Sequence, residues 1–255
     1  SGAGHACATL LEACALLSAP ELPAPDATAA PVPPAVPPTE PEPAVTAEVS
    51  LGYDTFYIFR GEELFEQVVW GQVSIDIALA ENLSLNLTPW YLSGIDDDYT
   101  ELDLLASLTY DAGFAEFTGG YAGYIYPRGS WGGNEGVDDE HEATLGVAKT
   151  LGIFDVGVLA AYNFDRDGTY LEASVGASFE LCDWAALEPS VAVGYSSNYF
   201  EEDGFTHVLL TLGLPLKLTE TATLTPYVAG NLPLEVLDAD QDAEMFGGVA
   251  LAVSF

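Results

Sequence analysis

Positively charged residues are scarce in this chain. Its 255 residues include five Lys and Arg against 40 Asp and Glu, which gives a formal charge of −35 at pH 7. Nucleic acid is therefore excluded as a partner, because binding a phosphate backbone requires clustered cations. Such acidity is typical of disordered chains when apolar residues are also scarce, but 49% of this chain is hydrophobic. Acidic and apolar side chains must therefore occupy different faces or different segments.

Long apolar runs are absent as well. No stretch reaches the roughly 18 apolar residues that a transmembrane helix needs. Residues 1–20 have no basic start, and Glu12 interrupts their apolar stretch, so they do not resemble a secretory signal peptide. We therefore take the chain to be already processed.

The first 46 residues differ in composition from the rest. Residues 19–46 hold most of the prolines and predict a polyproline II strut that would reach on the order of 87 Å at about 3.1 Å per residue. Within residues 3–18, apolar side chains recur at helical spacing, which predicts a short amphipathic helix, with a frayed terminus as the alternative. We expect residues 1–46 to form a leader ahead of one domain, residues 47–255.

From residue 47 onward the apolar residues recur every second position. Residues 73–79, 171–181 and 249–255 show the pattern most clearly. Because side chains alternate along a strand, each segment has one apolar face and one face of small, hydroxyl or carboxylate residues. Twelve strands are predicted, at 47–59, 67–80, 83–92, 100–111, 114–126, 139–150, 153–164, 169–181, 185–196, 205–217, 221–231 and 244–255.

The connections between these strands alternate in length. Longer polar stretches lie at 60–66, 93–99, 127–138, 165–168, 197–204 and 232–243, and short turns separate them. A barrel inserted from the periplasm has its short turns on that side and its longer loops outside. The pattern predicts an all-β fold, a 12-stranded antiparallel transmembrane β-barrel with a Pro-rich periplasmic extension.

A soluble sandwich could show the same periodicity, because the period does not say which face meets water. Three features favour a bacterial outer-membrane barrel. Most strands have the 9–11 or more residues that a tilted strand needs to cross a bilayer, aromatic residues gather near strand ends as an interfacial girdle would, and the last alternating strand closes on Phe255.

Two further patterns carry a resemblance. A terminal Phe255 is similar to the signal that the barrel-assembly machinery reads, although Val253 stands where a second aromatic residue is usual. The run Tyr57-Ile-Phe-Arg60-Gly61, the acidic strand 101–110 and the Tyr-rich hairpin 119–127 resemble the TorF-type porin family over residues 47–255. The resemblance implies a small barrel with pore activity.

The inward faces should carry most of the chemistry. The expected pore-lining residues are Asp76, Glu101, Asp103, Glu116, Glu142, Asp155, Glu172, Glu180, Glu188 and Lys217. Rings of carboxylates favour cations and exclude anions, so the lumen is predicted to prefer cations. The alternative is that these residues only make the wall polar.

Three of the five cations, Arg60, Arg128 and Arg166, fall at outer strand ends. They predict either a basic outer rim or local pairing with acidic neighbours, such as Glu62, Glu63, Asp165 and Asp167. Asp238, Asp240 and Asp242 are spaced as oxygen ligands for Ca²⁺ could be, but without the Gly and Glu of an EF-hand loop. The alternatives are a solvated acidic loop and divalent ions that bridge such loops to lipopolysaccharide.

Catalysis and cofactors have little support. The three histidines, His5, His141 and His207, stand in no GxSxG or comparable arrangement, so no enzyme activity and no cofactor are expected. The three cysteines show no metal or haem spacing. A disulfide from Cys182 to Cys7 or Cys14 is predicted in the oxidising periplasm, with three buried thiols as the alternative.

The predicted function is a porin-like channel for passive diffusion of small hydrophilic solutes, cationic or neutral. The alternative is a structural outer-membrane anchor whose Pro-rich leader binds a periplasmic partner or the cell wall. Outer-membrane lipid, lipopolysaccharide and the barrel-assembly machinery are the expected partners, and the barrel could also form oligomers.

Overall fold

The computed structural model describes residues 44–95, 99–127, 138–239 and 241–255. All regular structure in these residues is β-strand, and they contain no helix long and apolar enough to cross a membrane. The expected helix and proline strut of the leader lie outside the described residues.

Fourteen strand segments form the wall, and two pairs of them are single strands with a break. β8 and β9 are separated at Ser178, and β11 and β12 at Leu214 and Pro215, where proline has no N–H to donate. The bounds are β1 Val45–Phe59, β2 Glu62–Ala80, β3 Leu83–Gly94, β4 Thr100–Asp111, β5 Glu116–Ile125, β6 Glu140–Leu151, β7 Phe154–Asn163, β8 Gly168–Ala177, β9 Phe179–Cys182, β10 Ala185–Ser197, β11 Gly204–Gly213, β12 Leu216–Lys217, β13 Ala222–Pro233 and β14 Glu244–Ser254.

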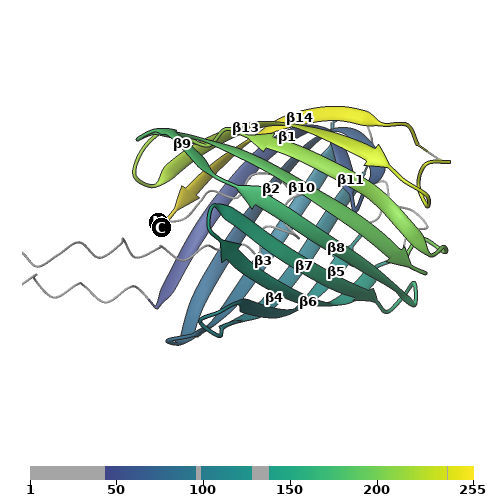
Figure 1. The fold of residues 1–255 in the computed structure, drawn as a ribbon, viewed down its shortest axis with the longest axis horizontal. Coiled ribbons are helices and arrows are strands. Elements are labelled where there is room, and N and C mark those ends of the chain that lie inside the picture. Colours follow the sequence, from purple (N-terminus) through teal and green to yellow (C-terminus); the bar gives the residue numbers. More distant parts are fainter. Residues whose placement is uncertain (1–43, 96–98, 128–137, 240) are drawn as a thin grey trace, which may run out of the picture.

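The sheet closes on itself. Each strand pairs antiparallel with its sequence neighbour, and β1 pairs with β14 from Glu48↔Ser254 to Asp54↔Gly248 (Figure 1). The prediction of a closed barrel of twelve antiparallel strands is therefore confirmed. Closure satisfies the edge hydrogen bonds of every wall strand, which a strand in hydrocarbon requires.

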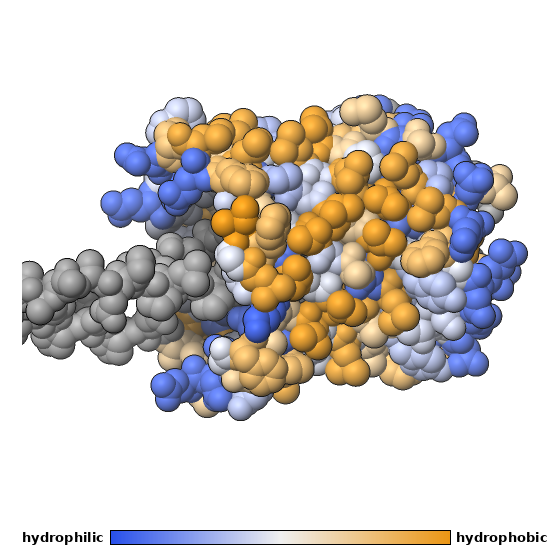
Figure 2. All heavy atoms as spheres, in the orientation of Figure 1, coloured by the Kyte–Doolittle hydropathy of each residue, from blue (hydrophilic) through white to orange (hydrophobic). Residues whose placement is uncertain are grey.

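Apolar side chains face outward along the wall. On β3, Leu87 and Tyr91 are exposed whereas Thr88 and Trp90 are buried inside, and β6, β11 and β13 alternate in a similar way. Figure 2 shows the result on one face of the barrel, where apolar residues cover the middle and hydrophilic residues lie at both ends. Exposed large hydrophobic residues lie on most of the strands, whereas soluble proteins rarely expose contiguous apolar patches larger than a few hundred Å². The barrel therefore has the surface of a membrane-spanning protein, and the soluble sandwich is excluded.

The two ends of the barrel differ. Ala47 and Phe255 exchange backbone hydrogen bonds at one end, so both ends of the barrel chain lie there; we call it the terminal end. The connections at this end are short: 81–82, 112–115, 152–153, 183–184 and 218–221. The opposite, loop end carries connections 60–61, 95–99, 126–139, 164–167, 198–203 and 234–243.

One expected loop is wrong. Residues 60–66 were predicted to form the first long loop, but β2 begins at Glu62 and the turn is only Arg60-Gly61. Residues 62–66 continue the ladder with β1, from Phe59↔Glu62 to Phe56↔Glu66. Hydrogen bonding between the strands of the hairpin overrides the acidic composition, which had indicated a loop.

The end of this hairpin leaves the wall. β1 pairs with β14 only as far as Asp54, and β2 pairs with β3 only from Val68 onward, so residues 56–66 pair with each other alone among the described strands. A register shift after Tyr57 and a positive φ of 50° at Gln67 mark the bend, as β-bulges do. We call residues 56–66 the inward hairpin, because its tip contacts the opposite wall.

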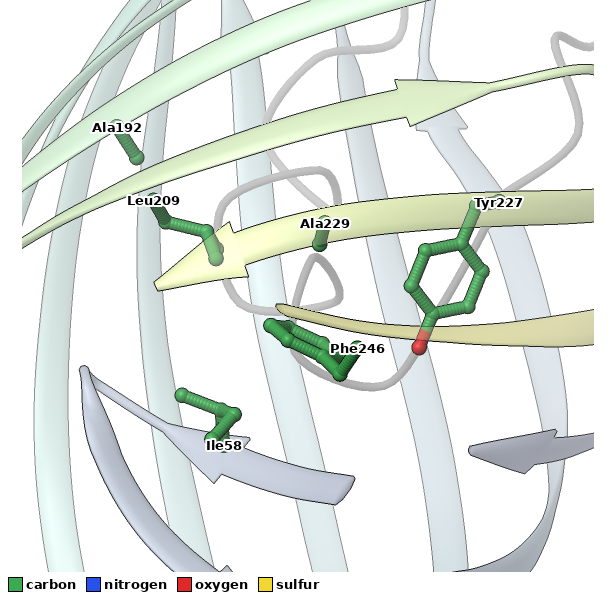
Figure 3. Close-up of a cluster of buried hydrophobic side chains, with 6 residues drawn as sticks. All are labelled: Ile58, Ala192, Leu209, Tyr227, Ala229 and Phe246. Carbon is green, nitrogen blue, oxygen red and sulfur yellow. The ribbon is translucent and has the colours of Figure 1, made fainter. Parts of the chain in front are cut away.

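Apolar side chains of the inward hairpin pack inside the barrel. Ile58 and Phe56 contact a cluster that includes Leu209 and Phe246, drawn in Figure 3. On the other side of the hairpin, Tyr57 packs with Trp90 in a second cluster, which also includes Val68, Trp70, Leu92 and Ala250. The loop half of the lumen is thus filled by side chains.

Candidate functional site in the barrel lumen

The turn of the inward hairpin places a cation inside the lumen. Arg60 and Gly61 have positive φ of 53° and 89°, which makes the two-residue turn. The Arg60 guanidinium donates from Nη1 to Glu142 Oε1 at 2.7 Å and from Nη2 to Oε2 at 2.6 Å. Glu142 lies on β6, across the barrel, and the two side chains are 2% and 0% exposed. Two parallel bonds of this kind are the strong geometry of an arginine–carboxylate pair.

Further contacts hold the pair. Glu142 also accepts hydrogen bonds from the hydroxyls of Tyr124 (3.0 Å) and Tyr199 (2.7 Å) and from Asn163 Nδ2 (3.2 Å). The guanidinium carbon lies 4.8, 4.8 and 4.7 Å from the ring centroids of Phe59, Tyr170 and Tyr199, within cation–π range. We call Arg60, Glu142 and the side chains that contact them the arginine clasp. These contacts replace the hydration that both charges lose on burial.

Tyr199 lies in the connection after β10, and its hydroxyl is a dependable donor. Burial, followed by the negative charge of Glu142, raises the pKa of this phenol well above its usual range, although Arg60 opposes the shift. The hydroxyl therefore stays protonated at neutral pH and donates to Glu142.

The next residue of the turn is held on the other side of the lumen. The Gly61 carbonyl accepts from Asn231 Nδ2 at 2.7 Å and from Gln241 Nε2, and Gln241 Oε1 accepts from the Glu63 N–H at 2.9 Å. A Cβ on Gly61 would lie 2.4 Å from the His207 ring. The hairpin tip therefore spans the lumen from β6 to β13 and requires glycine there.

The terminal half of the lumen is lined by small and hydroxylated residues. Asn86 Nδ2 donates to Ser74 Oγ at 2.8 Å and to Asp76 Oδ1 at 2.9 Å, and Thr88 Oγ1 donates to Asn86 Oδ1 at 2.8 Å. Exposed or partly exposed carboxylates stand around this half, on strands from β2 to β10: Asp76, Glu116, Asp155 and Glu188.

The strand register places the expected lining residues on the inner face. Glu101 and Asp103 lie opposite Leu92 and Trp90, and Glu172 lies opposite Leu159 and Gly194. Glu180 pairs with Ala186 and Lys217 with Thr223, both near the terminal end. These residues are not equivalent, since Glu101 and Glu142 are buried in the packed half whereas Asp76, Glu180 and Lys217 are exposed.

The expected basic outer rim does not describe Arg60, which is buried in the lumen, where it binds Glu142, 82 residues away in sequence. Arg166 binds Glu140 through Nε at 2.8 Å and Nη2 at 2.9 Å. Asp165, an expected partner of Arg166, accepts instead from the backbone N–H of His141. Arg128 lies outside the described residues.

The remaining expected sites are at the two ends. Asp238 and Asp242 lie in the β13–β14 connection, Asp240 is not described, and no group of three metal-ligating side chains is found in the described parts of the chain. Cys182 is exposed at the terminal end, and its two expected disulfide partners lie outside the described residues.

Sequence reasoning missed several residues of the lumen. Asp54 accepts from Trp70 Nε1 at 2.8 Å and from the Tyr227 hydroxyl at 2.7 Å inside the barrel. Tyr199 was counted in the aromatic girdle at the strand ends and Tyr124 in the Tyr-rich hairpin, but both are buried in the lumen and donate to Glu142. The signal was present for Asp54, a carboxylate on the inner face of the first strand, but nothing local marks the two tyrosines.

Solved structures of similar fold are outer-membrane proteins. The chain superposes on the COG4313 outer membrane channel from Pseudomonas putida F1 with a TM-score of 0.54 and 12% identity, covering 88% of this chain and 100% of that one. The KdgM porin gives a TM-score of 0.50 and 10% identity, with 82% and 99% covered. These likenesses show the outer-membrane β-barrel fold. No protein-family model and no curated protein matches the chain, so the TorF-type resemblance stays a prediction.

Proposed function

We propose that this protein is an outer-membrane channel for passive diffusion of small hydrophilic solutes, cationic or neutral. The observation that carries the proposal is a closed barrel with an apolar outer belt and a polar, carboxylate-bearing inner face. A wall of this kind separates lipid from an aqueous lumen. Twelve strands enclose more space than the side-chain-filled barrels of eight strands.

The charges of the lumen favour cations. The inner face carries many carboxylates, whereas its cations in the described residues are Arg60, which binds Glu142, and Lys217 near the terminal end. Carboxylates in a low-dielectric tube focus a negative potential, which attracts cations and repels anions.

The inward hairpin limits the flow. Because its tip spans the loop half of the lumen, solutes that enter the terminal half must pass the arginine clasp to cross. We therefore expect the wild-type conductance to be small for a barrel of twelve strands.

Planar-bilayer recording of the purified chain tests the function. A small ionic conductance with a reversal potential of cation sign in a KCl gradient supports the proposal, and anion preference contradicts its charge selectivity. Arg60→Ala should raise the conductance several-fold, because the hairpin loses its attachment to β6. Lys149→Ala, which removes an exposed cation from the outer face of β6, is the control and should leave the conductance unchanged.

The filled loop half also supports a second candidate, a structural membrane anchor. A hairpin held on both walls is not required for diffusion, and an anchor needs no open path. In this case residues 1–46 would bind a periplasmic partner or the cell wall. Absence of current in both the wild type and Arg60→Ala would favour the anchor, and cell-wall co-sedimentation that depends on residues 1–46 would support it.

A further inference from the structure

Three inner-face side chains form a row across neighbouring strands. Gln72 on β2 lies directly opposite Trp90 on β3, and Trp90 lies opposite Asp103 on β4. Side chains directly opposite in an antiparallel pair have their Cβ atoms about 4.5–5.5 Å apart. Gln72 and Trp90 are 5% and 4% exposed, so the row is enclosed within the lumen.

Gln72 and Trp90 have hydrogen-bonding capacity that the described residues leave unused. Gln72 Oε1 and Trp90 Nε1 are buried and have no hydrogen-bond partner among the described residues. Their neighbours differ. Trp70, on the same face, donates its N–H to Asp54, and Asn86 with Thr88, one step nearer the terminal end, are bonded to each other. Buried polar groups are nearly always paired, so an acceptor and a donor without partners on two directly opposite residues point to a missing group.

The position of the row suits a solute that enters from the terminal half. Toward the terminal end, the next inner-face residues are the hydroxylated Ser74 and Thr88. Toward the loop end, they are Trp70 and Leu92, which belong to the packed cluster beside the inward hairpin. The row is therefore the last polar position before the lumen fills with side chains.

The chemistry of the missing group follows from the two atoms. A hydroxyl can donate to Gln72 Oε1 and accept from Trp90 N–H at the same time. The carboxylates of Asp103 and Glu101 on the adjacent strand exclude an anion, and the rings of Trp90 and Tyr57, with centroids 5.8 Å apart, attract a cation. We propose that Gln72 and Trp90 form a binding site for the hydroxyl group of a small organic cation. This inference rests on the proposed channel function and names its solute class.

Bi-ionic reversal potentials provide the test. Ethanolammonium and propylammonium are similar in size and equal in charge. They differ only in that ethanolammonium has a hydroxyl group where propylammonium has a methyl group. The wild type should favour ethanolammonium beyond the ratio of the two ions' aqueous mobilities. Trp90→Phe and Gln72→Met each keep the side-chain bulk and remove one hydrogen bond, and each should lower the permeability ratio by roughly two- to tenfold, as the loss of one net hydrogen bond would. If Trp90→Phe does not fold, Gln72→Met tests the site on its own.

Trp70→Phe is the matched control. It removes a tryptophan N–H from the same face, but one that Asp54 already accepts, so it should lower the thermal stability without changing the ratio. Equal ratios in the wild type and all variants would mean that only ordered water occupies the row, and would overturn the site. If the wild type carries too little current, the same series is recorded in the Arg60→Ala background. Absence of cation current in both backgrounds would reject the channel itself, and with it the site.

Discussion

The two halves of the lumen use their charged residues differently. In the loop half, Glu142 is fully buried and accepts five hydrogen bonds, two of them from Arg60. In the terminal half, Asp155 and Glu188 are partly exposed and accept from the hydroxyls of Thr150 and Ser178. In the loop half, the charged residues thus hold the inward hairpin in place. The terminal half keeps its charges available to solutes. Substitutions in the loop half should therefore change mainly the stability, and substitutions in the terminal half should change mainly the ion selectivity.

Glu142→Ala tests this division most severely. It leaves the Arg60 guanidinium buried without its main partner, which costs about 3–5 kcal/mol in other proteins, and it should release the hairpin. We expect a lower temperature for the heat-induced shift in gel migration together with a several-fold larger conductance. Unchanged stability would mean that the clasp does not hold the loop half together.

Tyr199→Phe is a smaller change in the same half. The substitution removes one hydrogen bond to a buried carboxylate and keeps the ring beside Arg60, so the free energy of unfolding should fall by about 1.5–3 kcal/mol. Urea titration in lipid vesicles measures it. Tyr162→Phe is the control, because that hydroxyl bonds Asp167 on the exposed outer side, and its stability should stay near that of the wild type.

In the terminal half, the double variant Asp155→Asn with Glu188→Gln should change the ion selectivity and leave the stability nearly unchanged. The amide oxygens still accept from Thr150 and Ser178, so stability should change little. The cation-to-anion permeability ratio should fall, because two charges facing the lumen are lost. Glu81→Gln, in the β2–β3 turn outside the lumen, is the comparison. Equal ratios in the two variants would contradict a selective terminal half.

Arg166→Ala should have the smallest effect. Its ion pair with Glu140 lies at the loop end and is partly exposed to solvent, and exposed pairs contribute less than about 1 kcal/mol. Urea titration in lipid vesicles measures the change in the free energy of unfolding. A loss comparable to that of Glu142→Ala would show that the clasp extends to the outer surface.

Much of the barrel follows from local patterns. The strand at 83–92 could be predicted because Leu85, Leu87 and Tyr91 alternate with Asn86, Thr88 and Trp90, and the structure has β3 there. The region at 60–66 could not be predicted. Acidic residues usually indicate a loop, and the hydrogen bonds that extend β1 and β2 into the lumen depend on contacts with β6, β11 and β13.

The site was only partly within reach. The sequence alternation identified Glu142 as inward-facing, but it could not show that Arg60, 82 residues earlier, would neutralise it. It also could not separate Glu142 from Asp155, which occupies the same face on the next strand. The difference between them is their height in the barrel, and height depends on how the strands are staggered.

The order of apolar and polar residues by itself determined that this chain forms twelve strands, each with one lipid-facing side and one inward-facing side. Those properties repeat every two residues, so a local pattern is enough to encode them. Only the tertiary structure decided that the first hairpin turns inward and that its arginine binds Glu142. Closure of the barrel brings residues far apart in sequence to the same height across the lumen. A local sequence pattern cannot encode which of these distant residues will meet.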